Sequence, residues 1–501
     1  MGIRAVVAFL IPALIVVLLA AGNDNLVHWY VIPCMLNGMI SVYFIYDIIK
    51  SGKLYQITSI PHFMFFHLLF LSQLLHVYWN FYYPYPGPSD YRIWLGIASI
   101  FNFMGYIIYI FIVHTVSKRK VIRIKFISLI NKNNFNFFFP IIFGAVGAVL
   151  VYTYVSSGGL SGIVATSESR IGAGPGSNPY AGSGILYMIA ESFPIILFIG
   201  IVIVLRRRYG TKSIGWTPII LILMLYFVLL LLDGGLRGSR ADVVWGLLWA
   251  GMVVNFTLKP INMRKVMLFG GFIFLFMAVF YFYKHGGLSA LENVTNSQTR
   301  DSVFSKQTAG QNNSTASDEE NGNAAEFTIL HDFGRADIQA LALYKISSTN
   351  YELALGRSYL GGILSIIPRS VSNDRFPTVL KERTELLYGK GSYIQNGSFF
   401  CPWIFGLQGE AALNFGYVGF ILSFAVYGFV IRLLAKWIEE IPKNDSRIFI
   451  APFLINMAII SLIGDSQLVV FAAVKFGLIP FFTIWVISKK VYYSKKSTNL
   501  S

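Results

Sequence analysis

Long apolar segments separated by short polar turns run through most of this 501-residue chain. A helix that crosses a membrane needs about 20 consecutive, mainly apolar residues, and most of these segments are about that long. The pattern therefore predicts about twelve membrane-spanning helices. We place them near residues 4–21, 26–49, 60–81, 92–116, 135–155, 183–205, 217–233, 241–257, 266–283, 404–436, 448–464 and 467–488.

The composition supports the same fold class. Hydrophobic residues make up 55% of the chain and charged residues 13%, with a mean hydropathy of +0.61. Soluble domains usually carry about 25% charged residues, so a soluble enzyme is excluded, and two cysteines are too few for a disulfide scaffold. We expect an all-α polytopic membrane protein.

The net charge of +16 reflects topology rather than nucleic-acid binding. More than half of the 40 Lys and Arg residues fall in alternate short loops and in the two terminal segments. Short cytoplasmic loops are enriched in Lys and Arg, so both termini are expected in the cytoplasm. We expect membrane lipids as partners and no nucleic acid.

This topology divides the chain into three parts. Residues 1–283 would hold the first nine spans, 284–402 a large, partly helical extracytoplasmic loop, and 403–501 the last three spans and a cytoplasmic tail. Within the loop, the polar stretch 291–326 cannot bury a core and is interpreted as a flexible flap. Residues 327–402 contain apolar and aromatic positions and are expected to form an ordered cap, including a helix over 337–345 on the membrane surface.

The outer face is rich in arginine. Arg237 and Arg240 lie in a glycine-rich turn between two expected spans. The guanidinium group binds phosphate oxygens through two hydrogen bonds and stays charged at any relevant pH. The alternative is that these arginines reach lipid phosphates or anchor helix ends. The candidate phosphate- or substrate-binding residues are Arg237, Arg240, Arg335, Arg369, Arg375 and Arg170.

Motifs for metal or nucleotide chemistry are missing from the sequence. It contains no HExxH or CxxC motif, no Walker loop after a strand and no GxSxG turn. We therefore expect neither a metal site nor a cofactor.

Three short motifs resemble oligosaccharide repeat-unit polymerases, the Wzy-like O-antigen polymerases. The stretch 359–369 ends in Ile-Ile-Pro-Arg and is followed by Asn-Asp-Arg-Phe-Pro at 373–377, which looks like the family's "iPR…w-p-x-K-P" element. Residues 409–419 (GEAALNFGYVG) look like its "G-E-a-y-x-N-f-G-x-x-G" entry into a late span, and Gly-Ser-Arg at 238–240 is also similar. The chain departs from the family where Arg375 and Phe376 replace the lysine before proline, and it lacks the Arg-x10-Gly pattern of some members.

The resemblance implies a function, a fold and a location. Such polymerases resemble GT-C glycosyltransferases and transfer a glycan from undecaprenyl pyrophosphate to another lipid-linked unit, as a step of O-antigen and lipopolysaccharide biosynthesis. The active site would lie on the periplasmic side of the bacterial inner membrane. The expected partners are undecaprenyl-pyrophosphate-linked oligosaccharides and a polysaccharide chain-length regulator.

The implied reaction needs a base for the acceptor hydroxyl and donors for the pyrophosphate. We name Glu410, His331 and Asp332 as candidate catalytic residues, with Asp337 and Asp465 as further possible bases. Each acid could instead cap a helix or form an ion pair. Glu410 fits that alternative least well, because an unpaired carboxylate among apolar residues beside a membrane is costly.

Two other functions remain open. An O-antigen ligase would use the same donor and a similar outer loop. A lipid-linked oligosaccharide flippase or transporter should carry ionisable residues at the middle of its spans, near a broken helix. In this sequence the charges within spans are few, namely Glu191, Lys475 and Asp47. The arginines at the outer end favour the polymerase.

Overall fold

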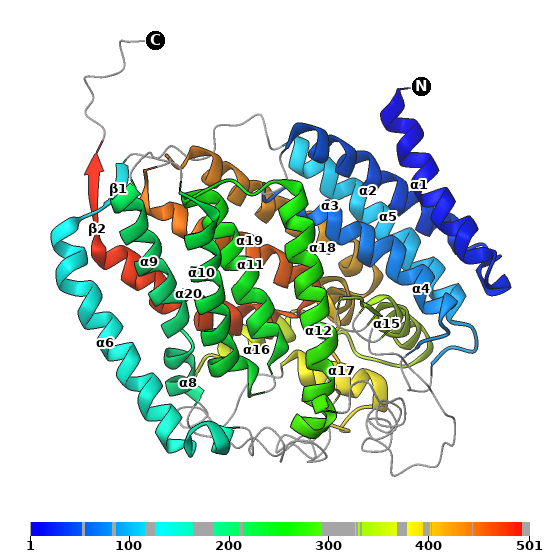
Figure 1. Ribbon diagram of the computed structural model, residues 1–501. Helices are drawn as coiled ribbons and strands as arrows, with labels where there is room; N and C mark the ends of the chain where they lie inside the picture. Colours follow the sequence, from blue (N-terminus) through cyan, green and yellow to red (C-terminus); the bar gives the residue numbers. More distant parts are fainter. Residues whose placement is uncertain are drawn as a thin grey trace. The chain divides into compact units, whose positions relative to one another are not determined.

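A computed structural model of the chain shows a protein built almost entirely from helices (Figure 1). It describes residues 2–52, 56–82, 87–115, 126–163, 184–209, 214–237, 239–292, 326, 329–330, 333–367, 378–393, 401, 403–442 and 444–492.

Within these ranges, ten helical segments are long and apolar enough to cross a membrane. The chain is therefore an all-α, multi-pass membrane protein. Each of the twelve predicted spans coincides with a helical segment. Two of the twelve predicted spans are not among these ten apolar segments. They are α11 (Arg240–Thr257), which has Arg240 and Asp242 in its first turn, and α12 (Met263–Glu292).

The chain folds as two compact units, each made of segments from distant parts of the sequence. Unit 1 comprises Met1–Val121, Gly322–Lys436 and Met457–Phe471, and unit 2 comprises Ile122–Asn321, Trp437–Asn456 and Ala472–Ser501. The division predicted from the sequence, at 284 and 403, concerns the order of spans and loops across the membrane and stays a prediction.

Unit 1 contains the N-terminal helices and the helices between residues 322 and 436. Its elements are α1 (Ile3–Ala20), η1 (Asp24–Leu26), α2 (Val31–Ser51), α3 (Ile60–Phe65), η2 (Phe66–Leu71), α4 (Ser72–Tyr78), α5 (Tyr91–Thr115), α15 (Ala336–Ser348), α16 (Arg357–Leu364), α17 (Val379–Tyr388) and most of α18 (Gly406–Glu440). The last part of α19 (Ala451–Ile463) and the start of α20 (Ser466–Ile487) complete it.

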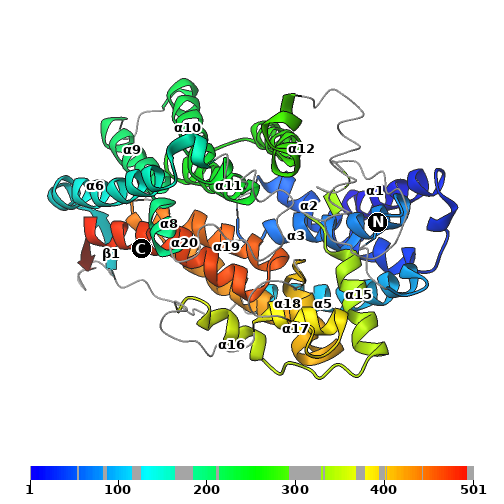
Figure 2. The same ribbon diagram turned by 90° about the horizontal axis from the view of Figure 1, so that it is seen from below.

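Helix α15 forms the centre of unit 1. All residues from Ala336 to Leu343 are buried, and they join three hydrophobic clusters with residues of η2, α4, α5, α17 and α18. Figure 2 shows α15 beside α5 and α17. The helix predicted over 337–345 is confirmed. Other helices of unit 1 bury its residues Ala336 to Leu343, and its expected place on the membrane surface stays a prediction.

Small residues let the helices of unit 1 pack closely. Gly105 of α5 lies against the ring of Phe424 of α18, and a methyl group at this glycine would overlap the ring. Close approach at small residues is typical of packing between membrane helices.

We expect Gly105→Ala to destabilise the protein by about 1–3 kcal/mol, because the buried Phe424 ring must move in a filled core. Thermal unfolding of the purified protein measures this effect. Gly144→Ala in α6 (Lys132–Ser156) is the matched control, since nothing lies within 4 Å of the added methyl group. Equal melting temperatures for the two variants would contradict the packing argument.

Helix α18 is interrupted after its first nine residues. Phe415 has φ −135° and ψ 16°, and Gly416 has φ 64° and ψ −150°, so neither residue is helical. The conformation of Gly416 is accessible in practice only to glycine. The short N-terminal piece, which contains Glu410, therefore points in a direction that differs from the rest of α18.

Unit 2 contains the middle helices and the C-terminal end of the chain. Its elements are β1 (Phe126–Ile130), α6 (Lys132–Ser156), α8 (Gly184–Ala190), α9 (Phe193–Tyr209), α10 (Trp216–Leu230), η4 (Leu231–Gly235), α11, α12, η6 (Ser446–Phe449), the first part of α19, most of α20, and β2 (Ser488–Tyr492). The side chain of Asn131 begins α6 by accepting hydrogen bonds from the next turn.

A two-stranded antiparallel sheet joins the start of α6 to the end of α20 in unit 2. Phe126 pairs with Tyr492 and Ile130 with Ser488 (Figure 1). Asp445 stabilises it by accepting the backbone N–H of Ser128 at 3.1 Å and pairing with Arg447 at 2.5 Å. The sequence interpretation did not include this sheet, because its strands are short and flank predicted spans.

Candidate functional site

Glu410 lies in the short N-terminal piece of α18, and its side chain is almost completely buried at 2% exposure. Its carboxylate accepts three hydrogen bonds from two other segments of unit 1. The Ser358 hydroxyl of α16 donates to it at 2.7 Å, and the Ser466 backbone N–H and hydroxyl both donate at 2.6 Å. Several donors directed at one carboxylate hold it in a fixed position.

Asn414, one helical turn after Glu410, ties α18 to α16. Its side-chain amide donates to the Ser358 hydroxyl at 2.7 Å and to the Glu410 carbonyl at 2.8 Å, and its oxygen accepts the Gly356 N–H at 2.8 Å. The Ser358 hydroxyl thus accepts from Asn414 while it donates to Glu410. Asn414 lies in the sequence motif that contains Glu410, and its i, i+4 spacing is the signal that could have identified it.

A second buried carboxylate is next to this group. Asp465 directly precedes Ser466 and pairs with Arg383 of α17 at 2.9 Å, and both side chains are less than 10% exposed. Burial and the negative charge of Glu410 raise the pKa of the neighbouring Tyr359 hydroxyl. The site therefore holds two carboxylates, Glu410 and Asp465, and one arginine, Arg383. The sequence interpretation did not include Arg383 among the site residues.

Of the candidate arginines, Arg335 is close to the start of α18. It precedes α15, and its side chain lies about 3.8 Å from where a Cβ at Gly406 would be. One guanidinium nitrogen donates to the Gly334 carbonyl at 2.5 Å. Arg335 therefore belongs to the same part of unit 1 as the piece of α18 that carries Glu410.

Asp337, one of the further possible bases, lies in the first turn of α15 and is completely buried. Its carboxylate accepts the Ile338 N–H at 2.8 Å and lies 3.5 Å from Nε2 of His76 in α4. This is the position of a carboxylate that stabilises a helix N-terminus. The geometry fits a structural role for Asp337.

Arg237 belongs to a separate buried network in unit 2. It donates to a Glu191 carboxylate oxygen and to the Asp233 carbonyl, and it lies 3.5 Å from the Asp233 carboxylate. All three side chains are about 10% exposed. Asp233 is in the π-helical turn η4, and such turns are frequent at functional sites.

Lys475 of α20 extends this network. Its ammonium group lies 2.7 Å from Glu191 and 2.8 Å from Asp242. Glu191 is in the turn between α8 and α9, and Asp242 is in the first turn of α11. Arg240 starts α11 and is 5% exposed. The sequence named Lys475 and Glu191 as charges within spans but gave no sign that they pair.

An apolar pocket of about 290 Å³ lies beside Arg237 in unit 2. Its walls are mainly aliphatic and aromatic side chains of α6, α8, α9 and α10, and Asp233 and Arg237 provide its charged end. This combination suits a ligand with an apolar chain and a polar group at one end.

No family model matches the chain, and neither the curated proteins nor the solved structures include a significant match.

Several predicted residues lie outside the described part of the chain. These are Arg170, His331, Asp332, Arg369 and Arg375, together with almost all of the predicted flap 291–326. Their assignments stay predictions. Within the described ranges, no group of three or more His, Cys, Asp or Glu side chains could hold a metal ion.

Proposed function

We propose that this protein is an oligosaccharide repeat-unit polymerase. It would have twelve spans, a GT-C-like arrangement, cytoplasmic termini and a periplasmic active site in the bacterial inner membrane. Its substrates would be undecaprenyl-pyrophosphate-linked oligosaccharides of O-antigen or a related surface polysaccharide. The support is the sequence resemblance at 238–240, 359–377 and 409–419 and the position of α16, which contains the start of the second segment, next to Glu410 of the third.

The observation that carries the proposal is the position of Glu410. Glu410 is a buried carboxylate that accepts three hydrogen bonds and lies next to a second carboxylate. A carboxylate that only caps a helix does not need this arrangement, which is typical of functional sites. Segments 358, 410–414 and 465–466 meet there. Residues 410–414 belong to a motif of the resemblance, and Ser358 directly precedes the motif that starts at 359. In the described conformation α16 and the 465–466 turn both cover Glu410, so the proposed site would have to open to admit an acceptor.

In the proposed reaction, the acceptor hydroxyl oxygen attacks the anomeric carbon of the donor glycan. The bond from that carbon to the pyrophosphate oxygen breaks, and its electron pair leaves with undecaprenyl pyrophosphate. Glu410 takes the hydroxyl proton. General bases of this kind contribute about 10²–10⁴-fold to the rate.

The leaving pyrophosphate needs positive partners. In unit 1, Arg335 is the candidate arginine whose side chain lies near Gly406 at the start of α18, and we propose it first as a partner of the pyrophosphate. Arg237 stays a proposed phosphate-binding residue on the strength of the sequence, and the apolar pocket beside it in unit 2 suits an isoprenoid chain. Arg240, Arg170, Arg369 and Arg375 stay proposed phosphate-binding residues on the strength of the sequence.

The surface polysaccharide of a deletion strain tests the function. Loss of a polymerase should leave single repeat units attached to the lipid core, and the cloned gene should restore the ladder. A core without any repeat unit would contradict polymerase activity and indicate a ligase or a flippase. A ligase mutant and a flippase mutant accumulate the lipid-linked glycan on different sides of the membrane. A membrane-impermeant reagent that oxidises sugars reaches this glycan from outside only in the ligase mutant.

Transport of a lipid-linked oligosaccharide is the second candidate. It is favoured by the buried network of Glu191, Lys475, Asp242 and Arg237 at the break between α8 and α9. Ionisable residues in membrane helices frequently mark substrate or ion pathways. The deletion phenotype described above separates this function from polymerisation.

A further inference from the structure

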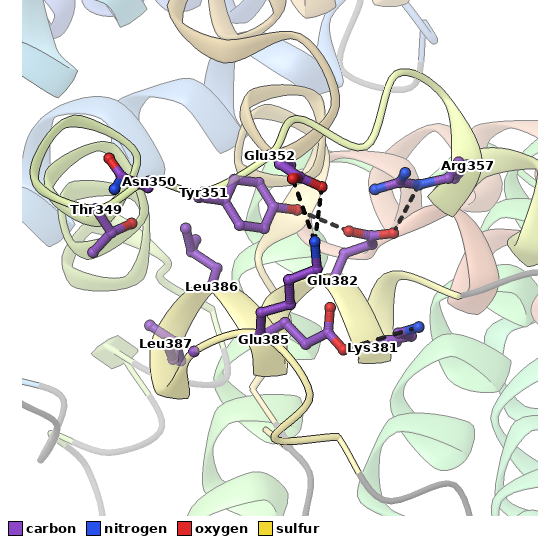
Figure 3. Close-up of a pocket in the computed structure, with 12 residues that line it drawn as sticks. Thr349, Asn350, Tyr351, Glu352, Arg357, Lys381, Glu382, Glu385, Leu386 and Leu387 are labelled. Atoms are coloured by element: carbon purple, nitrogen blue, oxygen red, sulfur yellow. Dashed lines mark hydrogen bonds and ion pairs between the residues drawn. The ribbon is translucent and has the colours of Figure 1, made fainter.

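A polar pocket of about 550 Å³ lies in the part of unit 1 formed by the large loop (Figure 3). Its walls come from the segment 349–352 after α15, the first residue of α16, the α17 helix and the turn that follows it. Ligand pockets usually enclose about 300–1,000 Å³. The size is therefore suitable for a small, compact ligand.

Glu382 of α17 is the most deeply buried charge in this pocket, with a side chain only 4% exposed. One carboxylate oxygen accepts the Tyr351 hydroxyl at 3.0 Å and the other accepts Nε of Arg357 at 3.3 Å (Figure 3). Burial and the charge of Glu382 raise the pKa of Tyr351, which keeps its proton as a donor. A carboxylate has about four acceptor positions, so Glu382 can accept two more hydrogen bonds from a ligand.

The charges around the pocket balance. Glu352, Glu382 and Glu385 face Arg357, Lys381 and Lys390. At the rim, Lys390 lies 3.2 Å from Glu352, and both side chains are more than 70% exposed. A phosphate or acidic sugar would approach three carboxylates and a cation would approach three basic groups, whereas hydroxyl groups can donate to the first set and accept from the second.

Two pairs of consecutive residues connect the pocket with the Glu410 site. On α16, Arg357 faces Glu382 while Ser358 donates to Glu410. On α17, Glu382 faces the pocket while the next residue, Arg383, pairs with Asp465. A ligand that touches Glu382 is thus held by the same two helices that position the buried carboxylates.

We propose that this pocket binds an uncharged sugar unit of the glycan, with Glu382 accepting hydrogen bonds from neighbouring hydroxyl groups. This inference rests on the proposed function, because it adds a saccharide-binding site beside the proposed reaction centre. The apolar side chains of Leu386 and Leu387 provide a surface for the C–H face of the ring. The pocket would select neutral glycans over acidic ones.

Glycan binding by the full-length protein in nanodiscs tests the proposal. The protein is applied to an array of defined bacterial surface glycans, and affinities are then measured for those that bind. We expect neutral glycans to bind, and Glu382→Gln and Tyr351→Phe to weaken that binding about ten- to a hundredfold. Glu440→Gln, at an exposed glutamate near the end of α18, should bind like wild type. Inorganic pyrophosphate should not compete.

Three results would overturn the proposal. The first is that the wild-type protein binds no glycan. The second is that it prefers acidic glycans or that pyrophosphate competes with the bound glycan. The third is that both pocket variants keep wild-type affinity at an unchanged melting temperature. Glu382-dependent binding alongside normal polymer in the deletion strain would support the pocket and reject the polymerase.

Discussion

Replacing Glu410 with glutamine should remove nearly all polymer, with a loss of activity of about 10²–10⁴-fold. Glutamine has almost the same shape and can still accept hydrogen bonds from Ser358 and Ser466, but it cannot take the proton of the acceptor hydroxyl. The serine hydroxyls can rotate towards the new amide group, so the loss of stability should stay within about 1–3 kcal/mol. The measurements are the polysaccharide ladder in cells and the melting temperature of the purified protein.

Glu440→Gln is the matched control for Glu410→Gln. It makes the same chemical change at an exposed position in the last turn of the same helix, α18. Its ladder and its melting temperature should equal those of wild type. A normal ladder in the Glu410→Gln strain would show that Glu410 only holds α16 and the 464–466 turn together.

Replacing Lys475 with methionine should be the most destabilising of the changes considered in unit 2. The side chain has a similar length, but its loss leaves Asp242 and Glu191 without the ammonium group that lies within 2.8 Å of both. Removing one partner of a buried ion pair typically costs about 3–5 kcal/mol, because the other charge stays buried. Thermal unfolding in detergent measures the cost.

A second variant identifies the cause of this loss. Adding Asp242→Asn to Lys475→Met removes the carboxylate that depends most on Lys475, while Glu191 keeps Arg237 as a partner. The double variant should therefore recover much of the lost stability. Lys50→Met, at an exposed lysine near the end of α2, is the control. An unstable double variant would mean that Lys475 contributes by packing rather than by charge.

The helices could be predicted from the sequence because membrane helices are recognisable from local composition. Each predicted span is helical, and α15 was also expected. The burial of α15 was not predictable, because its surroundings come from residues far along the chain in α5 and α18. A period of 3.6 residues identifies a helix but does not identify what covers it.

The candidate site was predicted only in part, for a related reason. Glu410 was found because a carboxylate among apolar residues is unusual. Its partners Ser358 and Ser466 are 52 and 56 positions away and are common residues, so nothing in the sequence marks them. Arg237 was named from the sequence as a candidate phosphate-binding residue, which stays a prediction. Its pairing with Glu191, 46 positions away, depends on the fold and could not be predicted.

The break at Gly416 resolves a mismatch between the length of α18 and the thickness of a membrane. A straight helix of 35 residues would be about 52 Å long, whereas the hydrocarbon core of a bilayer measures about 30 Å. The piece that follows Gly416 would be about 36 Å long, which is enough to cross the bilayer with a moderate tilt. The position of Gly416 therefore determines how far Glu410 would lie from the hydrocarbon. Lengthening or shortening the part of α18 that follows Gly416 would move the carboxylate relative to the lipid headgroups.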